Sequence, residues 1–209
     1  MVKVKVCGIT NLEDALKALE LGADALGFNF YPPSPRYLSP EQAGAILKGL
    51  PQQVFNVALF VDEPKAKVRA ILDQCSLPGG RQPFSALQFH GAESPEYCGG
   101  WGLKVIKAFR VKDRESLAAV NRFPADFYLL DSWTEGYGGS GSSFPWSWLE
   151  GAKADRFFLA GGLDCDNVVE AVRRVRPYAV DVCTGVEARP GIKDHAKLKD
   201  FILAAKASA

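Results

Sequence analysis

Short apolar runs alternate with helical patterns along the whole chain. Runs with a period of two, or without polar interruption, predict strands, whereas apolar residues spaced three or four positions apart predict amphipathic helices. The strands are predicted over residues 2–7, 23–30, 54–61, 84–89, 103–109, 126–131, 156–160 and 178–182. Helices are predicted between them, over residues 12–21, 113–120, 146–150 and 194–206, from Ser39 and from Ser94, around residues 68–72, and from Asp164 or Asp166 to Val175.

This alternation indicates a parallel sheet covered by helices. Eight strand–helix units in 209 residues average about 26 residues each, which is short but sufficient for a (β/α)8 barrel. A doubly wound open sheet is the alternative. The count of eight and the short connections favour the barrel, and no linker or shift in composition divides the chain. We therefore predict one α/β domain over residues 1–209, a TIM barrel with eight parallel strands.

In such a barrel, functional side chains lie at the carboxyl ends of the strands and in the loops that follow. The first predicted strand alternates valines with Lys3, Lys5 and Cys7, so its polar face lines the barrel interior once helices cover the outside. Cys7 is either a small buried apolar residue or a general base. We predict that the ammonium group of Lys5 lowers the pKa of the Cys7 thiol toward neutrality, which suits a base.

Asp131 closes an apolar run at the end of the sixth predicted strand. A carboxylate in that position is costly to bury unless it has a partner or a function. It is either a hydrogen-bonded loop or helix-cap aspartate, or a general acid whose pKa is raised by apolar surroundings. His90 and Asp181 are further polar side chains at strand ends.

Glycines mark the turns after the last two predicted strands. Gly161 and Gly162 follow the seventh strand, and Thr184 and Gly185 follow the eighth. Glycine lets the backbone approach a ligand closely, and these two loops of a barrel often hold a phosphate through backbone N–H groups. The pattern predicts a phosphate site there.

Two other loops carry candidate binding features. Arg36 follows a segment with several prolines, and an arginine on so stiff an arm can present its planar guanidinium group to a carboxylate, although most loop arginines are solvated. Residues 136–141 match G-x-G-x-x-G, but these glycines do not lead from a strand directly into a helix, so no dinucleotide site is predicted. A mobile loop that closes over a substrate is the better interpretation.

Charge and cysteine content narrow the function classes. The chain has 25 basic and 24 acidic residues and a formal net charge of +1, which gives no electrostatic basis for binding nucleic acid or an anionic membrane. Its 5 cysteines form no C-x-x-C pair and its 2 histidines are far apart, so nothing in the sequence encodes a metal site. Because the cysteines are scattered and neither a signal sequence nor an apolar span is evident, we expect a cytoplasmic protein.

Several short motifs occur in order across nearly the whole chain. They are Lys5–Thr10, Gly27–Phe28, Ser34–Tyr37, Gln88–Gly91, Leu130–Asp131, Gly138–Gly141, Leu159–Leu163, Asp181–Glu187 and Pro190–Asp194. In this combination the chain resembles the phosphoribosylanthranilate isomerases, the isomerases of tryptophan biosynthesis.

The resemblance implies a one-domain barrel that catalyses an Amadori rearrangement. The aminoaldose N-(5'-phosphoribosyl)anthranilate becomes the aminoketose 1-(2-carboxyphenylamino)-1-deoxyribulose 5-phosphate. The resemblance further implies that Cys7 is the general base, that Asp131 is the general acid and that Arg36 binds the substrate carboxylate. His90 and Asp181 are expected to contact the substrate, and the glycine turns after the last two strands are expected to bind its phosphate. No cofactor, metal or obligatory protein partner is expected, and the ligand is the phosphoribosyl substrate itself.

The chain departs from the family pattern in three places. Cys183 stands before Thr184 where the family usually has serine, Pro145 stands where the family commonly has aspartate, and Phe89 replaces leucine before His90. Backbone donors survive the first change, whereas the second removes a helix cap beside the loop at residues 136–141.

Two alternatives to the isomerase remain open. One is another phosphosugar-binding barrel, such as a ribulose-phosphate epimerase or a thiamin-phosphate synthase type; the epimerase needs several metal ligands, for which 2 histidines are too few. The other is a non-catalytic module that binds a phosphoribosyl ligand. The presence of both Cys7 and Asp131 argues against it, since binding alone needs neither.

Overall fold

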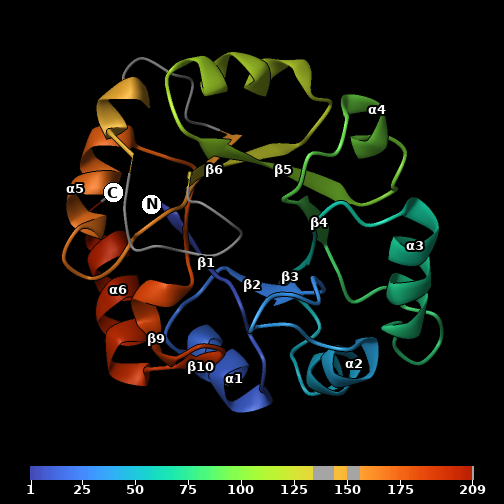
Figure 1. Ribbon diagram of the computed structural model, residues 1–209. Helices are drawn as coiled ribbons and strands as arrows, with labels where there is room; N and C mark the ends of the chain where they lie inside the picture. Colours follow the sequence, from blue (N-terminus) through green and yellow to red (C-terminus); the bar gives the residue numbers. More distant parts are fainter. Residues whose placement is uncertain (134–143, 150–155, 209) are drawn as a thin grey trace.

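The chain folds into a closed barrel of eight parallel strands surrounded by helices (Figure 1). The structure, a computed structural model, describes residues 1–133, 144–149 and 156–208. The strands are β1 (Lys3–Val6), β2 (Ala25–Asn29), β3 (Phe55–Phe60), β4 (Ala86–Phe89), β5 (Lys104–Val111), β6 (Phe127–Ser132), β7 (Phe157–Leu159) and β8 (Ala179–Val182). They pair in sequence order, and β8 pairs with β1 to close the ring. The predicted TIM barrel is confirmed, and the open-sheet alternative is wrong.

Helices follow the strands and cover the outside of the barrel (Figure 1). They are α1 (Leu12–Glu20), α2 (Pro40–Lys48), α3 (Lys65–Gln74), α4 (Pro95–Cys98), α5 (Val168–Val175) and α6 (His195–Ala207), with the 3-10 helices η1 (Glu115–Arg122), η2 (Trp146–Leu149) and η4 (Thr184–Val186). None of the helices in the described ranges is both long and apolar enough to cross a membrane.

Three of the helix predictions need correction. Residues 115–122 and 146–149 form 3-10 helices and not α-helices, a distinction that apolar spacing alone does not make. In addition, α5 does not begin directly after Asp164 or Asp166. The carboxylate of Asp164 accepts hydrogen bonds from the backbone N–H groups of Asp166 and Asn167, which forms a turn and delays the helix until Val168.

Polar side chains begin two of the early helices as the sequence predicts. The side chain of Asn11 accepts a hydrogen bond from the backbone N–H of Asp14 at the start of α1. Ser39 and Gln42 form a reciprocal capping box at the start of α2, with Pro40 in the first turn. Such caps satisfy backbone donors that have no partner inside the helix, and they fix where each helix begins.

The apolar core has two layers, one inside the barrel and one between the barrel and the helices. Alternation along each strand separates the two layers. On β6, Leu129 belongs to the inner cluster together with Ile106, whereas Tyr128 and Leu130 belong to the outer cluster. The same alternation directs Asp131, two residues beyond Leu129, toward the interior of the barrel.

A short antiparallel hairpin lies between β8 and α6, and the sequence pattern does not predict it. Its strands, β9 (Glu187–Arg189) and β10 (Ile192–Lys193), are 3 and 2 residues long, which is too short for a period of two to show. Gly191 turns the chain between them with φ of 81°, a left-handed conformation that favours glycine. The hairpin brings Lys193 to the ends of β1 and β8, where its ammonium group contacts the carbonyl oxygens of Cys7 and Cys183.

Asp24 links the beginning and the end of the described chain. Its Oδ1 lies 2.9 Å from Lys3 Nζ at the start of β1, and its Oδ2 lies 3.0 Å from Lys206 Nζ in α6. The backbone N–H of Val4 also donates to Oδ2, at 3.0 Å. These contacts hold α6 against the amino-terminal end of the barrel.

We expect Asp24→Asn to lower the free energy of unfolding by about 1 kcal/mol at pH 7. Partial burial raises the pKa of Asp24, but hydrogen bonds from Lys3, Val4 and Lys206 outweigh it and hold this pKa below its usual range. Since the folded-state pKa lies below the unfolded-state value of about 3.9, the stabilisation is fully present above that value and is lost as the pH falls through the folded-state pKa.

Urea unfolding at pH 7 and at about pH 3 measures this effect. The difference between Asp24→Asn and the unsubstituted chain should shrink at the lower pH. Glu20→Gln is the control, because Glu20 is largely exposed in its ion pair with Lys17, and its removal should change little. An equal difference at both pH values would contradict the role of the Asp24 carboxylate.

Candidate active site

Side chains from the carboxyl ends of several strands line one cavity of about 140 Å³. The predicted site residues that line it are Cys7, His90, Asp131, Gly161, Gly162, Asp181 and Thr184. Arg36 and Gly185 lie beside the cavity and are not part of its lining. The barrel geometry therefore brings together side chains that are widely separated in the sequence.

Cys7 lies directly after β1 on the interior side of the barrel. As predicted, Val4 and Val6 pack in the outer core layer, which turns Lys5 and Cys7 inward. Space for them comes from Gly27 on β2, because a Cβ atom there would lie 2.8 Å from Cys7 Sγ and 3.1 Å from Lys5 Nζ. The glycine of the Gly27–Phe28 motif thus makes room for the thiol.

The pKa of Cys7 shifts in the opposite direction from the one predicted. Burial raises the pKa of the thiol, and the charge of Asp181 adds to the increase. Lys5 and Lys193 lower it, but they do not outweigh the burial. The expectation that Lys5 brings the thiol pKa toward neutrality is therefore wrong, although Lys5 does favour the thiolate.

Lys5 and Asp181 form an ion pair inside the barrel. Lys5 Nζ lies 2.8 Å from Asp181 Oδ1, and the two side chains are 0% and 9% exposed. Although burial alone would lower it, the nearby Asp181 carboxylate raises the pKa of Lys5 above its usual value, so the lysine stays charged. Asp181 thus has a structural partner as well as a place in the cavity wall.

Asp131 and His90 face each other across the cavity mouth. His90 Nε2 lies 3.2 Å from Asp131 Oδ2, and the side chains are 16% and 28% exposed. Gln88 Nε2 lies 2.9 Å from His90 Nδ1, and with Nδ1 as the acceptor of this contact the ring proton lies on Nε2, facing Asp131. Apolar surroundings for Asp131 were expected, and that expectation is wrong, because its carboxyl group is partly exposed and has a polar partner.

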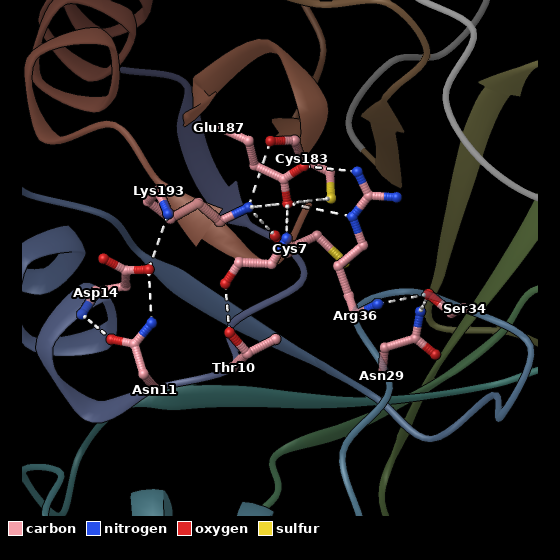
Figure 2. Close-up of polar contacts among 11 residues, drawn as sticks. Cys7, Thr10, Asn11, Asp14, Asn29, Ser34, Arg36, Cys183, Glu187 and Lys193 are labelled. Atoms are coloured by element: carbon pink, nitrogen blue, oxygen red, sulfur yellow. Dashed lines mark hydrogen bonds and ion pairs between the residues drawn. The ribbon is translucent and has the colours of Figure 1, made fainter. Parts of the chain in front are cut away.

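Arg36 is held by Glu187 on β9 (Figure 2). Arg36 Nε donates to Glu187 Oε1 at 3.2 Å, and Arg36 Nη2 donates to Oε2 at 2.6 Å, a two-pronged contact that fixes the guanidinium plane. Burial opposes ionisation of Glu187, but Arg36 and Lys193 hold its pKa below the usual range. Figure 2 shows the remaining guanidinium nitrogen, Nη1, directed away from Glu187.

Lys193 is a buried residue of the site that the sequence reasoning did not single out. Its Nζ donates to the carbonyl oxygens of Cys7 at 2.6 Å and Cys183 at 3.3 Å, and it lies 3.2 Å from Glu187 Oε1 (Figure 2). Glu187 and Lys193 both lie within the motifs that the chain shares with the isomerase family. Those motifs are the one feature of the sequence that includes both residues. Together they tie the ends of β1 and β8 to the arginine.

The glycine turns bring the loops after β7 and β8 into contact. Gly161 has φ of 87°, and a Cβ atom there would lie 2.2 Å from Ser132 Oγ. Gly162 also has a left-handed conformation, with φ of 65°. At Gly185, a Cβ atom would lie 2.1 Å from the carbonyl oxygen of Leu163, so this glycine allows the two loops to touch. Close approach at Gly161 and Gly185, and the left-handed backbone at Gly161 and Gly162, therefore explain these glycines without reference to a ligand.

All three departures from the family pattern lie at described residues. Pro145 directly precedes η2, where its carbonyl oxygen accepts a hydrogen bond from the backbone N–H of Trp148. The thiol of Cys183 lies in the cavity wall, and burial raises its pKa to about 12. Phe89 packs against Tyr97 and Trp101 in the outer core, so the aromatic ring replaces leucine at an apolar position. The loop at residues 136–141 lies outside the described residues.

A sequence profile of the family described as N-(5'phosphoribosyl)anthranilate (PRA) isomerase matches residues 4–204. The chain belongs to this family. The phosphoribosylanthranilate isomerase of Pelobacter propionicus is 48% identical over 208 residues, which cover 99% of this chain and 96% of that protein. The family and the isomerase class predicted from the motifs are confirmed, and another type of phosphosugar barrel is excluded.

Solved structures of phosphoribosylanthranilate isomerases have the same fold. The enzyme from Thermotoga maritima superimposes with a TM-score of 0.88 at 46% identity, covering 99% of this chain and 100% of that chain. A phosphoribosylanthranilate isomerase was also solved in complex with reduced 1-(o-carboxyphenylamino)-1-deoxyribulose 5-phosphate. It superimposes with a TM-score of 0.84 at 43% identity and covers 99% of this chain and 100% of that chain.

We expect Gly161→Ala to destabilise this isomerase by roughly 3 kcal/mol, because the methyl group meets Ser132 and the backbone is left-handed. Gly44→Ala in α2 is the matched control, since nothing lies within 4 Å of a Cβ atom there. Alanine also favours a helix over glycine, so this variant should keep or gain stability, by up to about 1 kcal/mol. Thermal unfolding measures both. Equal melting temperatures for the two variants would contradict the crowding at Gly161.

Proposed function

We propose that this chain catalyses the Amadori rearrangement of N-(5'-phosphoribosyl)anthranilate to 1-(2-carboxyphenylamino)-1-deoxyribulose 5-phosphate, with Cys7 as general base and Asp131 as general acid. One observation carries the assignment of these roles. A thiol from β1 and a carboxyl group from β6 line the same cavity, although more than a hundred residues separate them. Family membership supports the reaction itself.

The acid step opens the sugar ring. Asp131 in its protonated form donates a proton to the furanose ring oxygen, the bond from C1 to that oxygen breaks, and the lone pair of the anilino nitrogen forms the C1=N bond of a Schiff base. Asp131 is left as a carboxylate. The Nε2–H group of His90, which faces it at 3.2 Å, donates a hydrogen bond to this carboxylate and stabilises the product of the transfer.

The base step moves the carbonyl position from C1 to C2. The Cys7 thiolate removes the proton from C2, and the electrons of the C–H bond form the C1=C2 bond while the iminium electrons return to nitrogen. The resulting enolamine becomes the ketone when C1 gains a proton and the C2 hydroxyl group loses one, with the C1=C2 electrons taking up the proton at C1 and the O–H electrons forming C2=O. Return of the proton on Cys7 to C1 and of the hydroxyl proton to the Asp131 carboxylate would restore both groups. Since the thiol pKa is raised by burial, the positive charges of Lys5 and Lys193 and of the substrate iminium are what favour the thiolate.

Two further groups hold the substrate in this proposal. The phosphate binds to the backbone at Gly161, Gly162 and Thr184, which line the cavity on the side of β7 and β8. The anthranilate carboxylate binds to Arg36, whose guanidinium plane Glu187 fixes in advance. The ligand is a small phosphoribosyl compound, as it is for the isomerase solved with the reduced product analogue.

The experiment follows the loss of phosphoribosylanthranilate fluorescence in the unsubstituted chain and in Cys7→Ser and Asp131→Asn. Each substitution should lower kcat by about 10²- to 10⁴-fold and leave the affinity for a product analogue nearly unchanged. Cys165→Ser is the matched control, because this thiol contacts the carbonyl oxygen of Lys197 and lies outside the cavity lining.

Two results would contradict the proposal. Full turnover by Cys7→Ser or Asp131→Asn would remove that residue from its role. Binding of the analogue by the unsubstituted chain without any turnover would instead support the non-catalytic alternative.

Arg36→Met should act mainly on KM. Removing a charged hydrogen-bond donor from a carboxylate costs a factor of about 10 to 100 in affinity, and the reacting atoms lie elsewhere. A substrate analogue without the carboxylate should bind equally weakly to Arg36→Met and to the unsubstituted chain. If the variant discriminates against that analogue as strongly as the unsubstituted chain does, another residue holds the carboxylate. Thermal unfolding of the variant separates this effect from any loss of structure caused by an unpaired Glu187.

A further inference from the structure

Lys107 on β5 is a buried cation in the apolar layer between the barrel and the helices. On this strand Ile106 and Ala108 belong to the inner cluster and Val105 to the outer one, so Lys107 shares the helix-facing side with Val105. Its side chain is 3% exposed. An ammonium group in such surroundings is costly unless several partners replace its water.

Within the described residues, the hydrogen-bond and ion-pair partners of Lys107 lie at the end of β4 and in the segment that follows it. Lys107 Nζ lies 2.7 Å from Glu93 Oε2 and donates to the carbonyl oxygens of Gly91 at 2.7 Å and Phe89 at 3.3 Å. Phe89 and Gly91 are the two neighbours of His90 in the chain. The lysine therefore holds the backbone on both sides of His90.

Glu93 completes the arrangement from the other side. Its carboxylate accepts hydrogen bonds from the backbone N–H group of Gly91, at 3.1 and 3.0 Å, and from that of Asp62 after β3, at 2.9 Å. Asp62 in turn accepts a hydrogen bond from Ala92 N–H, at 2.6 Å, and itself has φ of 50°. A Cβ atom on Gly91 would lie 2.3 Å from Asp62 Oδ1, so the loops after β3 and β4 are in tight contact.

This network ends at the proposed acid. The backbone N–H of His90 donates to the carbonyl oxygen of Phe60, at the end of β3, at 2.9 Å. The backbone of His90 is therefore held directly, as well as through its two chain neighbours. The imidazole then contacts Gln88 through Nδ1 and Asp131 through Nε2. Neither Lys107 nor Glu93 is part of the cavity lining, so these two residues act on the reaction indirectly, and His90 is the titratable lining residue beside their contacts.

We propose that Lys107 and Glu93 are positioning residues that fix His90 and, through it, the carboxyl group of Asp131 for proton transfer. This inference rests on the proposed role of Asp131 as the acid. A buried ion pair seldom adds stability over an uncharged pair of similar shape, but it does impose one geometry on the groups that solvate it. Here those groups are the two peptides that flank His90.

The test neutralises the pair without leaving a buried charge. In Lys107→Met/Glu93→Gln, the glutamine oxygen still accepts hydrogen bonds from Gly91 and Asp62, so the loop keeps its acceptor. We expect kcat to fall about tenfold or more while KM stays within about twofold, because misplacing a reacting group affects the chemical step. The thermal melting temperature should stay close to that of the unsubstituted isomerase.

A double-mutant cycle with His90→Ala shows whether the pair acts through the imidazole. In the His90→Ala background, neutralising the pair should cause no further fall in kcat. An equal, multiplicative fall in both backgrounds, or an unchanged kcat in a folded neutralised variant, would overturn the proposal. Lys3→Met/Asp24→Asn is the matched control; it removes an ion pair at the opposite end of the barrel and should leave kcat unchanged.

A measurement without substrate keeps this inference separate from the proposed function. The chain has 2 histidines, so the imidazole resonances of His90 and His195 are readily assigned by NMR. Neutralising the pair should shift the His90 signals and leave those of His195, which contacts Asp14, in place. Unmoved His90 signals overturn the positioning role. Absence of turnover in the unsubstituted chain overturns the proposed function alone.

A second variant covers the case in which Lys107→Met/Glu93→Gln does not fold. Lys107→Arg keeps the positive charge but displaces the donor atoms, and it should shift the same His90 signals.

Discussion

The ion pair between Lys5 and Asp181 is the interaction on which the rest of the structure depends, because it lies where the barrel closes. The two strands that meet there come from opposite ends of the chain, and their register sets Lys5 directly opposite Asp181. A slip of β1 by one residue would turn Lys5 toward the outer apolar layer and leave Asp181 inside the barrel without its partner. The correct register also places Cys7 beside Cys183, so the pairing that closes the barrel brings these two cavity-lining residues together.

Two other buried lysines repeat one arrangement on different sides of the barrel. Lys193 donates to the carbonyl oxygens of Cys7 and Cys183 and pairs with Glu187. Lys107 donates to two carbonyl oxygens around His90 and pairs with Glu93. In each case a loop that carries a proposed functional side chain is solvated by an ammonium group in place of water, which leaves that loop little freedom to move.

The alternation of strands with helices and the count of eight units are enough to predict the barrel with Asp131 and Asp181 at strand ends, and the period of two along β1 predicts the inward direction of Cys7, because these signals depend on each residue's own neighbours. The strand pattern does not predict the contacts of Lys193, since β9 and β10 are too short to show a period and these contacts join distant segments. The direction of the Cys7 pKa shift was wrong for a related reason. The nearness of Lys5 is visible in the sequence, whereas the burial of the thiol, which dominates, appears only in the fold.

The contacts of Asp24 with Lys3 and Lys206 bring the first strand and the last helix to one point, as the N and C marks in Figure 1 show. The chain can therefore be connected in a different order without changing which strands are neighbours in the barrel. A short bridge between the two ends, with new ends opened at the exposed turn of Gly79 and Gly80, gives a circular permutant that keeps every strand neighbour. In that permutant β8 is followed directly by β1 along the chain, and the two strands that close the barrel are joined by the bridge.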